Sequence, residues 1–152
     1  MATIISNSTA ETIQLAERIG KKLQGGEVIE VISDLGGGKT QFVKGLTQGM
    51  GSPDHVQSPT FTINRIYKNL AGLELHHFDF YRLHEPGVVA ETLKEALVNP
   101  KTIVAIEWSQ IVQNVLPADR LQVTITATGI ESRTIIFLAL GNKAKDLLKG
   151  IT

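Results

Sequence analysis

The chain has 152 residues and a mass of 16.5 kDa, a size that fits one domain, which we expect to span residues 1–152. Fifteen Lys and Arg balance fifteen Asp and Glu, so the composition disfavours a protein that coats nucleic-acid backbones through net positive charge. The chain has no cysteine, which excludes disulfides, thiolate metal sites and cysteine nucleophiles.

The N-terminal residues contain no basic segment followed by an apolar stretch, so we expect no signal peptide. No run approaches the roughly 18 apolar residues that a membrane-spanning helix requires. We therefore expect a soluble, cytoplasmic protein that does not associate with membranes.

Hydrophobic periodicity and turn residues predict alternating helices and strands along the chain. Ser8 to Glu11 is typical of a capping box, and the helix that follows is expected to end at Gly25 and Gly26. The first half then predicts a strand over 27–32, a helix from about 39 to 50, and strands over 60–68 and 73–81. The second half predicts a helix over 88–98, a strand over 102–108, a short helix to about 115, and a hairpin over 121–127 and 134–140. The pattern predicts an α/β fold with a mixed sheet.

The glycine-rich turn after residues 27–32 carries the strongest chemical signal. Residues 33–40 read S-D-L-G-G-G-K-T, the Walker A pattern with Ser33 in place of its first glycine. The three glycines let backbone N–H groups face phosphate oxygens, and the following helix adds its positive dipole end. Lys39 would reach the β- and γ-phosphates, and Thr40 would bind Mg²⁺. The alternative is a turn whose lysine is only solvated, which the strand–loop–helix context disfavours. We therefore predict a three-layer sandwich of the P-loop NTPase kind.

A P-loop also requires a carboxylate at the end of another strand to hold Mg²⁺, directly or through water. Asp79 and Glu107 each end a predicted strand, and the strand before Glu107 is nearly all apolar. A carboxylate in that position emerges at the edge of the sheet where α/β proteins bind ligands. Both acids are therefore candidates for a functional role, the alternative being an exposed acid at a strand end.

The histidines and the loop before the first hairpin add weaker signals. His76 and His77 are neighbours on a predicted strand and so point to opposite faces, which disfavours a transition-metal site. Thr60 follows Ser58 and Pro59 in a polar loop, at the place where nucleotide switches often sense the γ-phosphate. By itself this segment would be an ordinary turn.

Two classes of P-loop protein can be tested against the sequence. The only near match to the guanine-selective N-K-x-D pattern is residues 142–145, which lack the aspartate, and Asp79 has no glycine three residues later. A GTPase is therefore disfavoured. A small-molecule kinase stays as an alternative class, although the arginines are scattered and no arginine-rich lid is visible.

Four blocks of sequence, in this order and spacing, closely resemble the TsaE family, also called YjeE. They are D-L-G-G-G-K-T-Q-F-V-K-G-L from residue 34, S-P-T-F-T-I from 58, H-F-D-F-Y-R-L from 77 and A-I-E-W from 105. The resemblance extends from the helix at 8–24 to the final strand. The last three blocks are far more specific than a Walker motif.

The resemblance implies a small bacterial ATPase of tRNA N6-threonylcarbamoyladenosine (t6A) synthesis, with ATP and Mg²⁺ as cofactors. Such a protein acts with the TsaB–TsaD pair, which modifies adenosine 37 of tRNAs reading ANN codons, so tRNA would be met through that complex. We expect slow hydrolysis by the isolated chain, because no arginine stands in a fixed motif near the phosphates. Alternatives are a small-molecule kinase and a non-catalytic module that ATP switches for docking.

The resemblance also implies roles for individual residues. Family members usually read G-D-L-G-A-G-K-T, so Ser33 and Gly37 depart from the family pattern. Catalytic roles are implied for Lys39, Asp79 and Glu107, and metal-binding roles for Thr40, Asp79 and Glu107. Nucleotide contacts are implied for Thr9, Gly36, Gly37, Gly38, Lys39, Thr40, Gln41, Thr60, Trp108 and Arg133.

Overall fold

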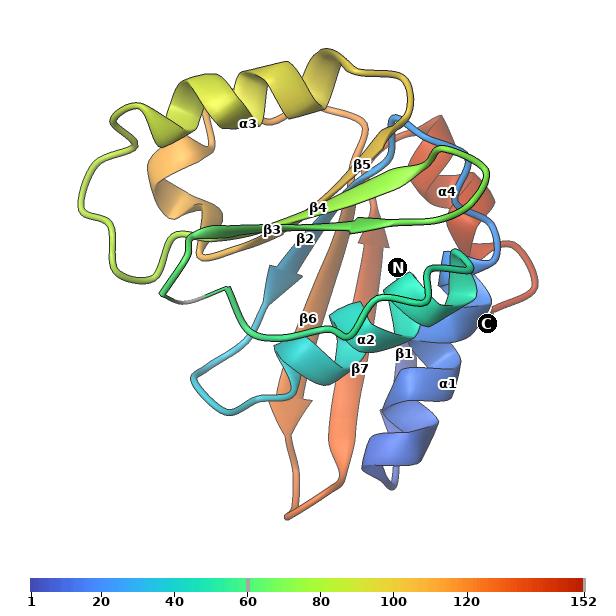
Figure 1. The fold of residues 1–152 in the computed structure, drawn as a ribbon. Coiled ribbons are helices and arrows are strands. Elements are labelled where there is room, and N and C mark those ends of the chain that lie inside the picture. Colours follow the sequence, from blue (N-terminus) through green and yellow to red (C-terminus); the bar gives the residue numbers. More distant parts are fainter. Residues whose placement is uncertain (60, 152) are drawn as a thin grey trace.

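A computed structural model describes residues 1–59 and 61–151. Within this part, seven strands form one sheet in the order β1-β7-β6-β2-β5-β4-β3 (Figure 1). The strands are β1 (Ala2–Ser6), β2 (Val28–Ile32), β3 (Asn64–Lys68), β4 (Glu74–Asp79), β5 (Thr102–Glu107), β6 (Leu121–Ala127) and β7 (Arg133–Ala139). The helices are α1 (Thr9–Gly20), α2 (Lys39–Gly49), α3 (Val89–Val98), α4 (Asn142–Leu148) and a short 3₁₀ helix, η1 (Ser109–Val112).

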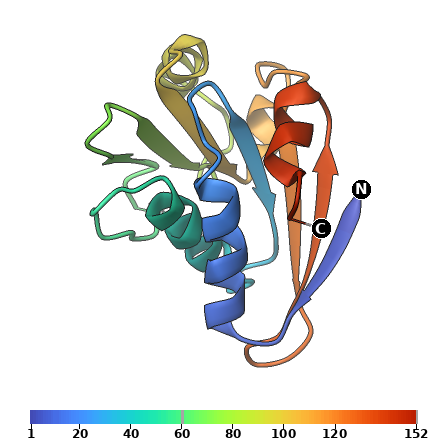
Figure 2. The same ribbon diagram turned by 90° about the vertical axis from the view of Figure 1, so that its right-hand side faces the viewer.

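The centre of the sheet is parallel and its margins are antiparallel. β2 pairs in parallel with β5 and β6, and β4 pairs in parallel with β5. The outer pairs β1–β7, β6–β7 and β3–β4 are antiparallel, and Figure 2 shows β1 at the margin beside β7. Because the carboxyl ends of parallel strands meet at one edge, the segments that follow β2, β4 and β5 converge there.

Helices cover both faces of the sheet. One hydrophobic cluster joins α1, α2 and α4 to the sheet, and includes Phe42, Leu46 and Phe137. A second cluster, which includes Phe78 and Leu93, joins α3 and η1 to the other face. In Figure 1, α3 lies above the sheet and α1 and α2 lie below it. The predicted three-layer α/β sandwich with a mixed sheet is therefore confirmed, and β5 is buried along its whole length as expected for a central strand.

Close contact between α1 and α2 explains why their facing positions are glycines. A Cβ on Gly45 would overlap the carbonyl oxygen of Ile13, and a Cβ on Gly49 would overlap that of Glu17. The prediction that the first helix continues to Gly25 is wrong, since α1 ends at Gly20. After this point the chain tightens into i→i−3 hydrogen bonds.

Several other boundaries differ from the sequence prediction. β1 and α4 were not predicted, because β1 is a short edge strand and α4 buries only Ala144 and Leu147. The strand predicted over 60–68 begins at Asn64, since the N–H groups of Thr62 and Ile63 turn back to Pro59 O. The short helix predicted to about 115 is only one 3₁₀ turn, η1.

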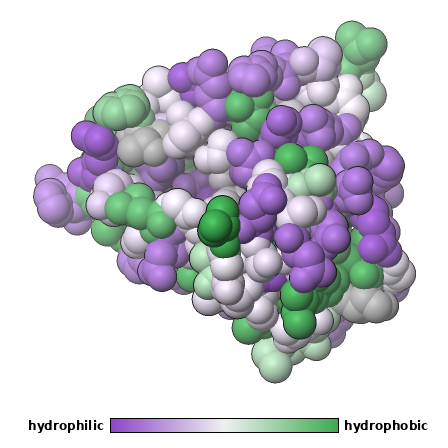
Figure 3. Space-filling view, turned by 90° about the horizontal axis from the view of Figure 1, so that it is seen from below, coloured by the Kyte–Doolittle hydropathy of each residue, from purple (hydrophilic) through white to green (hydrophobic). Residues whose placement is uncertain are grey.

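Viewed from the end where the β6–β7 hairpin projects, the surface shows no single dominant apolar patch (Figure 3). From there, hydrophobic side chains form separate groups among hydrophilic ones (Figure 3). Among the helices in the described part of the chain, none has the length and apolar character needed to cross a bilayer.

Candidate nucleotide-binding site

The loop between β2 and α2 has the backbone shape that its glycines allow. Gly36 has φ +72° and Gly38 has φ +105°, in the left-handed region that L side chains rarely adopt. Gly38 precedes the first residue of α2 and has no side chain to cap that helix. The free N–H groups at this helix start therefore face the loop, as an anion site requires.

Lys39 is held at the centre of this loop. Its side chain is buried, and its ammonium donates to the carbonyl oxygens of Ser33 at 3.2 Å and Asp34 at 2.9 Å. The same ammonium lies 5.1 Å from the centre of the Trp108 ring, a cation–π contact. The cation is thus fixed in position by backbone carbonyls and an indole face.

Trp108 reaches Lys39 through an unusual backbone conformation. It follows β5 directly and has φ +54°, which costs a non-glycine residue conformational energy. Its ring also packs against Tyr81, with ring centres 5.0 Å apart. Strain of this kind persists where surrounding contacts impose it, often at functional sites.

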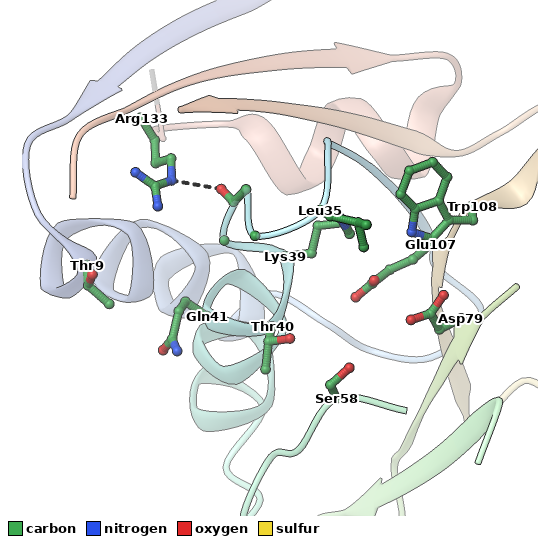
Figure 4. A pocket seen from close by; sticks show the side chains of 13 residues that line it. Thr9, Leu35, Lys39, Thr40, Gln41, Ser58, Asp79, Glu107, Trp108 and Arg133 are labelled. Carbon is green, nitrogen blue, oxygen red and sulfur yellow. Dashed lines mark hydrogen bonds between the residues drawn. The ribbon is translucent and has the colours of Figure 1, made fainter. Parts of the chain in front are cut away.

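Two carboxylates face the loop from the ends of neighbouring strands. Asp79 and Glu107 are register partners at the ends of β4 and β5, and each is less than 5% exposed. Asp79 accepts a hydrogen bond from the Tyr81 N–H at 2.9 Å. In Figure 4 both carboxylates, and the Thr40 hydroxyl, point into the space beside Lys39.

Glu107 has a buried partner, His77, which the sequence offered only as a possible metal ligand. His77 Nε2 lies 2.7 Å from Glu107 Oε1, and the histidine side chain is fully buried. His76, its neighbour, instead contacts Glu74 at 2.9 Å. The alternation of side chains along β4 thus puts only His77 on the face that carries Asp79 and Glu107.

One pocket of about 400 Å³ brings the predicted site residues together. Every predicted residue except Thr60 lines it, and Thr60 lies outside the described residues. Contacts of these residues with a nucleotide or with Mg²⁺ stay predictions. The lining is Thr9, Leu35, Gly36, Gly37, Gly38, Lys39, Thr40, Gln41, Ser58, Asp79, Glu107, Trp108 and Arg133.

The end of the pocket away from the carboxylates is formed by Thr9, Gln41 and Arg133 (Figure 4). Arg133 Nε donates to Gly37 O at 2.8 Å, and its Nη1 donates to carbonyl oxygens of the β6–β7 turn. Thr9 donates to Glu131 in the same turn at 3.3 Å. The hairpin therefore braces both α1 and the loop.

The two departures from the family pattern lie against each other. A Cβ added to Gly37 would overlap Ser33 Oγ and come within 2.9 Å of Ser33 Cβ. Gly37 does not have a positive φ, unlike Gly36 and Gly38. The glycine at 37 is therefore required by the volume of Ser33 and not by backbone conformation.

Ser58, which opens the S-P-T-F block, lines the pocket although it was not predicted as a site residue. The loop that carries it is fastened by Tyr67, whose hydroxyl donates to Gln57 O at 2.9 Å and accepts from Gln57 N–H at 3.1 Å. Burial is the main cause that raises the pKa of this tyrosine above its ordinary value. No pattern in the sequence indicates that Tyr67, seven residues beyond Thr60, bonds to the loop in this way.

The donor set fits Mg²⁺ better than a transition metal. Across residues 1–59 and 61–151, no group of three or more His, Cys, Asp or Glu side chains is placed to hold a metal ion. Mg²⁺ is commonly bound by one or two carboxylates together with substrate phosphates. Asp79, Glu107 and the Thr40 hydroxyl, beside the Walker A loop, match that pattern.

Comparisons with known proteins identify the family of this chain. The model of the family described as "Threonylcarbamoyl adenosine biosynthesis protein TsaE" matches residues 6–135. A tRNA threonylcarbamoyladenosine biosynthesis protein TsaE from Bacillus subtilis is 34% identical over 93% of this chain and 88% of its own length. One from Haemophilus influenzae is 35% identical over 78% of this chain and 74% of its own length. A crystal structure of Bacillus subtilis YdiB superposes with a TM-score of 0.80 at 29% identity, covering 99% of this chain and 93% of YdiB.

Proposed function

The chain belongs to the TsaE family of tRNA threonylcarbamoyladenosine biosynthesis proteins, and on that premise we propose that it is a Mg²⁺-dependent ATPase of that pathway. Its ATP turnover would support the TsaB–TsaD pair in modifying adenosine 37 of tRNAs that read ANN codons. It would contact tRNA only through that complex, in the cytoplasm.

The observation that carries this proposal is the meeting of a P-loop lysine with two buried strand-end carboxylates in one pocket. A glycine turn with a solvated lysine would need neither carboxylate. A simple anion site at a helix start would be weakened by two nearby acids, because they repel phosphate. A phosphate-bound divalent cation explains why both charges are present.

In the proposed reaction, water attacks the γ-phosphorus in line, the bond to the β–γ bridging oxygen breaks, and ADP and inorganic phosphate leave. Lys39 and the loop N–H groups would stabilise the charge on the phosphate oxygens. Thr40 and Glu107 would hold the cation, and Asp79 would support the cation or orient the water. When bound, Mg²⁺ supplies positive charge to the β- and γ-phosphates.

The arginines of the described residues support slow turnover by the isolated chain. Arg133 is the one that lines the pocket, and its Nε and Nη1 are bonded to backbone carbonyls. Arg82 stacks on the exposed Phe61 ring, 4.5 Å from its centre. An arginine that stabilises transferred phosphoryl groups raises rates by several orders of magnitude. We therefore expect TsaB and TsaD to accelerate hydrolysis.

Lys39→Ala tests the phosphate site. We expect it to lower affinity for a non-hydrolysable ATP analogue about 100-fold in calorimetry, as expected for the loss of two charged hydrogen bonds of about 1.5 kcal/mol each. Lys44→Ala, on α2 but outside the pocket, is the matched control. Unchanged affinity in Lys39→Ala would rule out the assignment of the loop.

Labelled ATP separates the reaction classes. Inorganic phosphate released in the presence of TsaB, TsaD and tRNA supports the ATPase. Label transferred to an organic acceptor would indicate a kinase, and analogue binding without any turnover would indicate a docking module. Normal t6A in cells whose only copy carries Lys39→Ala would contradict the role in the pathway.

A further inference from the structure

His77 is a fully buried polar side chain that the proposed reaction does not use. It lies on β4, two residues before Asp79, with Ala105 of β5 as its register partner. Its Nε2 lies 2.7 Å from Glu107 Oε1. Its Nδ1 is buried and has no hydrogen-bond partner among the described residues.

This geometry defines which nitrogen carries the proton. A carboxylate oxygen can only accept, so Nε2 must donate to Glu107. Since no described residue offers Nδ1 an acceptor, the Nε2–H tautomer leaves the fewest donors unsatisfied. Among the described residues, the buried imidazole therefore makes one hydrogen bond, from Nε2 to one oxygen of Glu107.

The other oxygen of Glu107 is left to the pocket. Within the described part of the chain, Glu107 Oε2 has no hydrogen-bond partner, and Glu107 lines the pocket beside Thr40. A single donor that fixes one oxygen restricts rotation of the carboxylate and so sets the direction of the second oxygen.

We propose that His77 is a positioning residue, which holds Glu107 through Oε1 so that Oε2 is presented to a divalent cation bound with the nucleotide. This inference rests on the proposed function. His77 is not among the residues that line the pocket, so it would touch neither nucleotide nor cation. Its effect is expected in the affinity for the cation, because outer hydrogen-bond partners of metal ligands commonly contribute 10- to 100-fold.

The test measures binding of a fluorescent, non-hydrolysable ATP analogue as Mg²⁺ is titrated. We expect His77→Leu to raise the Mg²⁺ concentration at half-effect about 10-fold, with analogue affinity in EDTA unchanged. His77→Gln retains an N–H donor at a similar reach and should recover most of that loss. His76→Gln is the matched control, since His76 is bonded to Glu74, and should behave as wild type.

A second measurement needs no substitution, so it decides even if His77→Leu unfolds. Long-range ¹H–¹⁵N spectra of the wild-type protein should show His77 protonated at Nε2. The Nε2 signal should shift when Mg²⁺ is added to the analogue complex, while signals of His76 should not.

The possible outcomes distinguish a failure of the positioning role of His77 from a failure of the proposed ATPase function. A wild-type Mg²⁺ midpoint in folded His77→Leu, or a proton on Nδ1 of His77, would overturn the positioning role and leave the ATPase proposal intact. Equal losses in His77→Leu and His77→Gln would also overturn it, since a donor would then be irrelevant. If the affinity of the wild-type protein for the analogue does not depend on Mg²⁺, the proposed function is overturned as well.

Discussion

Two buried glutamates on neighbouring strands have very different surroundings. Glu30 on β2 accepts from Arg120 Nε at 2.9 Å, Gln122 Nε2 at 2.8 Å and Gln113 Nε2 at 2.5 Å, and also from the Ser109 hydroxyl. Glu107 on β5 accepts from His77 alone among the described residues. Both glutamates are at most 3% exposed. Burial thus does not distinguish them, but the number of donors does.

The register of β2 and β5 separates the two carboxylates. Glu107 is opposite Val31, so Glu30 is one residue away and points to the other face of the sheet. On that face Glu30 joins β2 to η1 and β6 through its four donors. A carboxylate whose oxygens are all occupied stabilises the fold, whereas one with an open oxygen at a pocket is equipped to bind.

The largest expected effect is that of Glu107→Gln. It should lower the rate of ATP hydrolysis in the assembled complex by about 100-fold or more, since a neutral amide cannot hold a cation or orient water as a carboxylate does. The free energy of unfolding should change by less than about 1 kcal/mol, because the amide oxygen still accepts from His77. Hydrolysis assays and urea unfolding measure the two effects. Full hydrolysis in this variant would remove the distinction drawn between the glutamates.

Glu30→Gln should show the opposite profile. It introduces an N–H₂ group among donors and removes the negative charge that pairs with Arg120, so we expect a loss of about 3 kcal/mol in the free energy of unfolding. Affinity for the ATP analogue should stay within about twofold in the folded protein, a change below about 0.5 kcal/mol. Urea unfolding and calorimetry give both numbers. A larger loss of nucleotide affinity than of stability would place Glu30 in the site.

The pH dependence of stability tests whether the charge of Glu30 is what stabilises the fold. Burial by itself would raise the pKa of Glu30, but the hydrogen bonds from Ser109, Gln122, Arg120 and Gln113 outweigh it and hold the pKa below the ordinary value of 4.5. A lowered pKa stabilises the folded state above pH 4.5, and the contribution is lost as the pH falls through the lowered value. The stability difference between wild type and Glu30→Gln should therefore narrow as the pH falls from about 7 to below about 4. A stability difference that does not change with pH would contradict a stabilising role for the Glu30 carboxylate.

The smallest expected effect on nucleotide affinity concerns Ser33, which shares one feature with each of the two glutamates. Its Oγ is buried and has no hydrogen-bond partner among the described residues, as a group that binds a ligand would, yet it fills the space beside Gly37. If packing is its role, Gly37→Ala should lower analogue affinity about 10-fold, through overpacking of about 1.4 kcal/mol. Adding Ser33→Gly to Gly37→Ala should then restore it.

Gly36→Ala is the control for this pair. No described atom lies within 4 Å of a Cβ built on Gly36, but its φ is +72°. Its replacement should therefore weaken binding through backbone strain, and Ser33→Gly should not rescue it. The packing explanation fails if Gly37→Ala binds as wild type, or if Ser33→Gly rescues both glycine variants alike.

The elements that could be predicted are those whose signal is local. The Walker A segment places strand, glycine turn, lysine and helix within a few consecutive residues, so its shape follows from the residues themselves. β5 was predicted because its apolar run is continuous. β1 was not, because a five-residue edge strand is formed by its pairing with β7. α1 was predicted too long, because i→i−3 turns after Gly20 depend on tertiary packing against α2.

The sequence alone thus determined a Walker A segment, two candidate carboxylates at strand ends and the family, since each is read from neighbouring residues or short blocks. Only the tertiary structure decided that Asp79 and Glu107 lie beside Lys39, that His77 and not His76 reaches Glu107, and that Ser33 fills the place of a side chain at 37. Strand order and register set these contacts, and they depend on hydrogen bonds between segments tens of residues apart, which no local pattern encodes.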